Sequence, residues 1–195
     1  EYVGQYIIGN NEYDVSINRW LVHLITDMNM MFQDASGFNQ DISHWRVHNV
    51  TDMQYMFQNA EAFNQNINSW NVHRVQNMDF MFQNANKFNE SLNNWNVSCV
   101  TTMMQMFYGV TSFNQPLNSW NVHNLTNMNM MFMDASGFNQ DISRWNVHNV
   151  QDMSGMFYGA TSFNQDLSTW DISSLETVTH IFKDSGLSRV NWEYT

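Results

Sequence analysis

The sequence predicts an α/β solenoid in which a short helix and a short strand recur in every turn. Tryptophan occupies one phase of an uninterrupted 25-residue frame, at Trp20, Trp45, Trp70, Trp95, Trp120, Trp145 and Trp170. A unit that recurs at a fixed period of about 20–50 residues stacks on its neighbours to bury a face that it cannot bury alone. The 195 residues therefore predict one elongated body without a linker.

The first half of each repeat has helical spacing. Met28, Met31, Phe32 and Ala35 follow one another at steps of three, one and three residues, which places them on one helical face. A threonine or aspartate at the preceding positions supplies an oxygen for the unpaired amides of a helix start. We expect a short helix there, held by packing against the next repeat.

The second half of each repeat changes to a period of two. Trp45 and Val47 alternate with Arg46 and His48, a pattern that favours a strand with Trp and Val inward. Repeated once per turn, these strands predict a parallel sheet along one side of the body.

An asparagine column connects the two halves. Its members, 25 residues apart, are Asn39, Asn64, Asn89, Asn114, Asn139 and Asn164. Their side chains can bond turn backbone and one another, so we interpret the column as a structural ladder rather than a sugar or metal site.

Composition excludes several function classes. A net charge of −11 with only two lysines disfavours phosphate backbones and anionic lipid surfaces, so nucleic acid is a poor candidate. Cys99 is the only cysteine, which excludes an intrachain disulfide. No apolar run reaches the ~18–20 residues of a membrane span, and we expect any anchor or targeting signal to lie outside this segment.

The repeat M-F-x-x-A-x-x-F-N-Q-x-I-x-x-W resembles that of bacterial surface proteins called BspA-like or DUF285, over residues 26–175. The resemblance implies a leucine-rich-repeat-like, right-handed stack on a cell surface, with relatives in mycoplasma lipoproteins, lactic or listerial wall proteins, large DNA viruses and protists. It implies adhesion to a host or neighbouring-cell protein or glycan and brings no catalytic residue or cofactor. Independently, Ile42, Trp45 and Val47 have the apolar spacing of a leucine-rich-repeat strand. Where members of that family more usually carry a small hydroxyl residue, this chain has His48.

The ends depart from the repeat. We expect residues 1–25 to form an N-terminal cap with a partial repeat, residues 26–175 to form six repeats, and residues 176–195 to close the stack, with Val190 and Trp192 covering the last core layer.

The outward strand positions are the candidate binding residues. They are Arg46, His48, Asn71, His73, Asn96, Ser98, Asn121, His123, Asn146 and His148. A translational repeat presents the same group in a row, whereas an enzyme needs unlike groups that converge on one point. We therefore expect a non-catalytic surface module without a cofactor. A structural or virion surface component is the alternative.

The histidines permit two further interpretations. His23, His48 and His73 stand in successive repeats, and imidazole is the commonest transition-metal ligand, although a straight row does not converge into a tetrahedron. A pH-sensitive contact surface is the second interpretation; otherwise these histidines are ordinary solvated strand residues. The methionine columns that begin at Met28 and Met31 favour a polarizable core over a copper path, and turns explain the partial aspartate columns better than calcium does.

Overall fold

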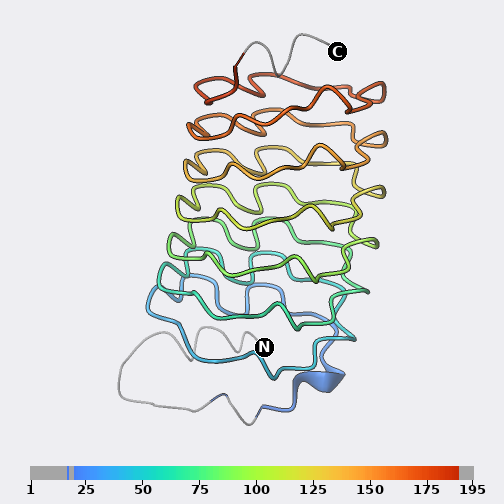
Figure 1. Cartoon of the computed structure of the whole chain (residues 1–195). Helices are drawn as coiled ribbons and strands as arrows, with labels where there is room; N and C mark the ends of the chain where they lie inside the picture. The colour runs from blue at the N-terminus through green and yellow to red at the C-terminus, as the bar shows by residue number, and fades with distance from the viewer. Residues whose placement is uncertain (1–16, 18–19, 189–195) are drawn as a thin grey trace.

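The computed structural model describes residues 17 and 20–188, and they form a stack of similar coils from the N-terminal to the C-terminal end (Figure 1). We call each 25-residue repeat a coil, the full coils being residues 26–50, 51–75, 76–100, 101–125, 126–150 and 151–175. A column is the set of residues at one phase of successive coils. The helix whose whole span lies in the described residues is η2, a three-residue 3₁₀ helix at Val22–Leu24.

Main-chain hydrogen bonds join each coil to the next along residues 28–34 and their equivalents. In the first coil the pairs, amide donor before carbonyl acceptor, are Met28–Asp52, Met30–Gln54, Phe32–Met56 and Asp34–Gln58, at 2.8–2.9 Å. Single-residue parallel bridges accompany them at Asp27–Asp52, Asp52–Asn77, Asn77–Thr102, Thr102–Asn127, Asn127–Asp152 and Asp152–Thr177. Every second amide of this segment therefore bonds to the neighbouring coil.

The remaining amides of the segment close tight turns within the coil. Met31 donates to the carbonyl of Met28, and Ala35 donates to that of Phe32. The third residue of each turn has a positive φ of 58° at Met30 and 61° at Asp34. Turns with these dihedral signs at their third position are type II. The segment is thus a chain of turns.

The predicted α/β solenoid, with one helix and one strand per turn, is wrong. A helix would send the amide of Phe32 to the carbonyl four residues earlier, but that amide donates to Met56 in the next coil. Apolar residues three and four apart fit a chain of three-residue turns as well as a helical face, so the spacing alone does not distinguish the two structures.

The predicted strand and its parallel sheet are also absent from the described residues. The amide of Trp45 closes a turn on the carbonyl of Ile42, and that of Val50 closes a turn on Val47. Trp45 and Val47 are buried as expected. The two-residue alternation thus predicts the buried side chains correctly, but the backbone turns on either side of residues 45–47. A leucine-rich-repeat-like architecture has a strand in every repeat, so this part of the prediction is also wrong.

Aromatic and methionine columns fill the interior. Phe57 stacks on Phe82 with ring centroids 5.5 Å apart, and Trp70 lies 6.5 Å from Trp95 with nearly parallel rings. The methionine columns that begin at Met28 and Met31 are buried in every full coil, which confirms the core interpretation. Rings of this size dominate the apolar area removed from water.

The asparagine column is the predicted structural ladder. The Oδ1 atom of each member accepts the main-chain amide of the next member, at 2.8 Å from Asn39 to Asn64 and 2.9 Å from Asn139 to Asn164. At the end of the column, the Ser188 amide donates to Asn164. These bonds satisfy backbone donors that have no other acceptor between coils.

Most of the predicted N-terminal cap and residues 189–195 of the predicted C-terminal cap, which include Val190 and Trp192, lie outside the described residues. Within the described part, Ile17 is buried and Leu187 is half-buried. Leu21 and Leu24 are exposed beside the first full coil.

Candidate functional site

The candidate binding residues share one side of the stack, which we call the turn face. It comprises residues 44–49 and their equivalents, 69–74, 94–99, 119–124, 144–149 and 169–174, together with 20–24 at the N-terminal end. The ten predicted positions all lie on this face, and each is exposed or half-buried. The prediction named it a sheet face, whereas its backbone consists of turns.

Asparagine side chains hold these turns through one atom each. The Oδ1 of Asn96 accepts the main-chain amide of Ser98 at 3.1 Å, and the Oδ1 of Asn146 accepts that of His148 at 3.3 Å. Because a main-chain amide only donates, the oxygen of each carboxamide is the atom that points to the backbone. The Nδ2 groups of Asn71, Asn96, Asn121 and Asn146 remain as donors with no partner in the described part of the chain.

Two imidazoles are oriented by carboxamide oxygens that also accept a main-chain amide, those of Asn71 and Asn121. The Nδ1 of His73 lies 2.8 Å from the Oδ1 of Asn71, and the Nδ1 of His123 lies 2.9 Å from the Oδ1 of Asn121. The acceptor is an oxygen, so Nδ1 carries the proton. Each ring consequently has its Nε2 atom left for an external partner.

His48 and His148 differ from this pair. The Nε2 of His48 lies 3.4 Å from the Nδ2 of Asn49, which also donates to the carbonyl of His23. The Nδ1 of His148 lies 2.9 Å from the Oδ2 of Asp171 in the next coil, with side chains 53% and 60% exposed. Hydrogen bonds from Ser173, followed by the bond and charge of His148, lower the pKa of Asp171.

Charge is segregated on the molecule. The described arginines and all but one of the described histidines lie on the turn face, at His23, His44, Arg46, His48, His73, Arg74, His123, Arg144 and His148. Asp171 is the face's single acid among the described residues. The net charge of −11 therefore arises elsewhere on the chain.

Aspartates of other columns support turns, as the column of Asp41 and Asp141 shows. Asp41 and Asp141 each accept the main-chain amide two residues later, from Ser43 and Ser143, at 2.9 Å. Hydrogen bonds from Ser43 and Ser143 lower the pKa of the two carboxyl groups. This arrangement agrees with the turn interpretation of the aspartate columns.

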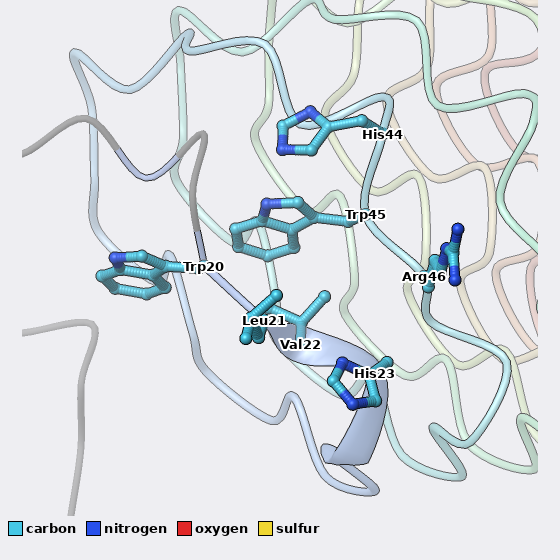
Figure 2. A pocket seen from close by; sticks show the side chains of 7 residues that line it. All are labelled: Trp20, Leu21, Val22, His23, His44, Trp45 and Arg46. Carbon is cyan, nitrogen blue, oxygen red and sulfur yellow. The ribbon is translucent and has the colours of Figure 1, made fainter.

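A pocket of about 580 Å³ opens at the N-terminal end of the turn face. Figure 2 shows its lining, which is Trp20, Leu21, Val22, His23, His44, Trp45 and Arg46. In later coils the indole Nε1 donates to a carbonyl 28 residues earlier, as Trp70 does to Ile42 at 3.1 Å. The Nε1 of Trp45 is buried without an acceptor in the described part of the chain.

The structure does not bring a metal site together. Among residues 17 and 20–188, no three His, Cys, Asp or Glu side chains are placed to hold one ion. His23, His48 and His73 lie in successive coils along the face, and Cys99 is a free, exposed thiol. No helix of the described residues has the length and hydropathy needed to cross a bilayer.

Sequence reasoning missed three members of the face. His44 and Arg144 share a column, and Arg74 donates to the Oδ1 of Asn49 at 3.3 Å. The predicted strand began at the tryptophan, so the residue before it was not assigned to the face, and an extended strand would turn position 74 inward. The basic side chains one residue before Trp or four residues after it were the available signal.

No curated protein matches the chain. The family described as "Mycoplasma protein of unknown function, DUF285" matches it over residues 5–106 and again over residues 87–193. The two overlapping matches agree with the internal repetition of the coils. The chain therefore belongs to the DUF285 family.

Proposed function

We propose that this chain is a non-catalytic surface module that binds a protein or glycan partner through the turn face. The observation that supports the proposal is the exposed row of carboxamide groups bonded to the turns beneath them, two of which also orient the imidazoles of His73 and His123. Groups that are already oriented lose little freedom on binding. The proposed location is outside the cell, at a surface.

Repetition favours binding over catalysis. Successive coils present equivalent groups side by side, whereas catalysis needs an acid, a base and a nucleophile that meet at one point. Extended stacks of repeats bind through the continuous surface that the stacking creates. The turn face is such a surface.

Binding of the labelled chain to an array of defined glycans and to intact bacterial and animal cells tests this proposal. Asn71→Ala with Asn121→Ala should weaken binding at least tenfold. Asn86→Ala with Glu61→Ala is the matched control, since both residues are exposed outside the turn face, and it should bind as the parent does. Equal loss in both double variants, or binding unaffected by either, would contradict the proposal.

A further inference from the structure

The turn face has its own chemistry, which differs from that of the rest of this acidic chain. Its charged or titratable groups within the described residues are His23, His44, Arg46, His48, His73, Arg74, Cys99, His123, Arg144, His148 and Asp171. One acid stands among many cationic or protonatable groups, so the local charge opposes the net charge. A local field of one sign attracts a ligand of the opposite sign even on a molecule of like net charge.

The outward atoms of the face are largely donors. The Oδ1 atoms of Asn71 and Asn121 are occupied by main-chain amides and imidazole Nδ1 groups. Their Nδ2 groups point to no acceptor in the described residues, and the neighbouring guanidinium groups only donate. The imidazole Nε2 atoms of His73 and His123 are acceptors when the ring is neutral and donors when it is cationic.

Protonation therefore converts the face from a mixed surface to a donor row. Imidazole is the side chain that ordinarily changes charge between pH 5 and 8. Once the rings are protonated, carboxamide N–H, imidazolium N–H and guanidinium N–H groups recur along the stack, with Asp171 as the one carboxylate of the face among the described residues. Charge-assisted hydrogen bonds to carboxylates are stronger than neutral ones.

We propose that the turn face binds a linear polysaccharide that carries ionised carboxylates, and that it binds more tightly in mild acid. This inference rests on the proposed binding function and names its ligand class. A linear polymer of identical acidic sugars repeats its charge and hydroxyl groups along its length, as the coils repeat their donors. Nucleic acid fits less well, because phosphate binding relies on lysine and arginine, and the face has more imidazole and carboxamide groups than guanidinium groups.

The geometry offers an isosteric test. Replacing Asn71 and Asn121 by aspartate keeps the Oδ1 that holds each turn and replaces the outward amide with an anionic oxygen. Asp171 occupies the same column and holds the same turn through its Oδ1 and Ser173, at 3.1 Å, so the fold accepts aspartate there. Asn66→Asp with Asn127→Asp adds the same charge outside the face, at columns that already contain Asp141 and Asp152.

The probe is polygalacturonate, compared with its fully methyl-esterified form at pH 5.0 and 7.5 by calorimetry. We expect polygalacturonate to bind at least tenfold more tightly at pH 5.0, and the ester to bind weakly at both values. Asn71→Asp with Asn121→Asp should abolish binding, whereas the Asn66 and Asn127 control should retain it. His73→Gln with His123→Gln should reduce the pH dependence, while His180→Asn, outside the face, should not.

Three results would overturn the inference. They are equal binding of the ester, absence of polygalacturonate binding at both pH values, and equal or tighter binding of single-stranded DNA. The proposed binding function would still stand if binding to the glycan array or to cells depends on the turn face. If that binding does not depend on the turn face, both proposals are wrong.

Discussion

The indole Nε1 of Trp95 donates to the main-chain carbonyl of Ile67 in the preceding coil at 3.0 Å. The ring also stacks on Trp70 and is 2% exposed. One side chain thus joins two coils by both a polar and an apolar contact.

Trp95→Ala should lower the free energy of unfolding by ~3–5 kcal/mol, because a large buried ring leaves a cavity that adjacent coils do not fill. Trp95→Phe keeps an aromatic ring without the donor and should cost less. Chemical denaturation measures both. An unchanged midpoint for the alanine variant would place the ring outside the core.

Asn139→Ala tests the asparagine ladder. The Oδ1 of Asn139 accepts the Asn164 amide at 2.9 Å and the Gln165 side-chain amide at 2.7 Å. Loss of the acceptor should destabilise the fold by ~1–3 kcal/mol, the usual cost of leaving a donor unsatisfied. Asn139→Asp retains the oxygen and should recover most of the stability in thermal unfolding. Equal stability of the alanine variant and the parent would show that this ladder bond is dispensable.

Asp79 gives a prediction for pH dependence. It is 8% exposed, and burial raises its pKa despite hydrogen bonds from Thr102 and the Met104 amide. The folded state therefore holds the proton more tightly than the unfolded state, so stability is greatest below the unfolded pKa and falls as pH rises through the folded pKa.

Asp79→Asn removes this charge and keeps an Oδ1 atom that can accept from Thr102 and the Met104 amide. Asparagine already occupies this column at Asn29 and Asn129. It should raise the free energy of unfolding at pH 7 by ~0.5–2 kcal/mol, as consensus substitutions commonly do. The gain should shrink as the pH falls, because the parent's carboxyl then takes up the proton that its raised pKa favours. A gain in stability that stays constant with pH would show that ionisation of Asp79 is not its cause.

Gly109 lies at φ +70°, in the column that elsewhere contains Asn59, Asn84 and Asp134. An added Cβ would lie 2.5 Å from the Oδ1 of Asn84. Gly109→Val should therefore destabilise the fold by more than ~1–2 kcal/mol, the cost of left-handed backbone for ordinary residues.

Gly109→Asn should be better tolerated, because Asn84 already donates to the Oδ1 of Asn59 one coil earlier at 2.9 Å. Gly37→Ala, with open space around the new Cβ, is the control. Thermal unfolding ranks the three variants, and a valine variant as stable as the parent would contradict the strained geometry.

The sequence was sufficient to predict which side chains are buried, but not the backbone path. The columns that contain Trp70 and Phe57 are buried, as their recurrence every 25 residues predicted. The asparagine ladder was also predicted. Asparagines that recur every 25 residues lie in successive coils, so the oxygen of each carboxamide can accept a donor of the next coil.

The backbone was mispredicted because side-chain spacing does not identify hydrogen-bond partners. Met28, Met31 and Phe32 have the same periodicity on a helix and on linked turns. The positive φ at bulky residues such as Met30 and Phe80 runs against residue preference, so composition gave no signal for those turns. The composition of the turn face was visible in the sequence, whereas the bonds that leave Nδ2 and Nε2 outward required the coordinates.

Alternate amides of residues 28–34 and their equivalents bond between coils, and this pattern defines the fold. Scalar coupling across hydrogen bonds, measured by NMR on labelled protein, identifies the partner of each amide. We predict coupling from the Phe82 amide to the Met106 carbonyl, which lie 3.0 Å apart. Coupling from the Phe82 amide to the carbonyl of Met78, four residues earlier, would show a helix and contradict bonding between coils.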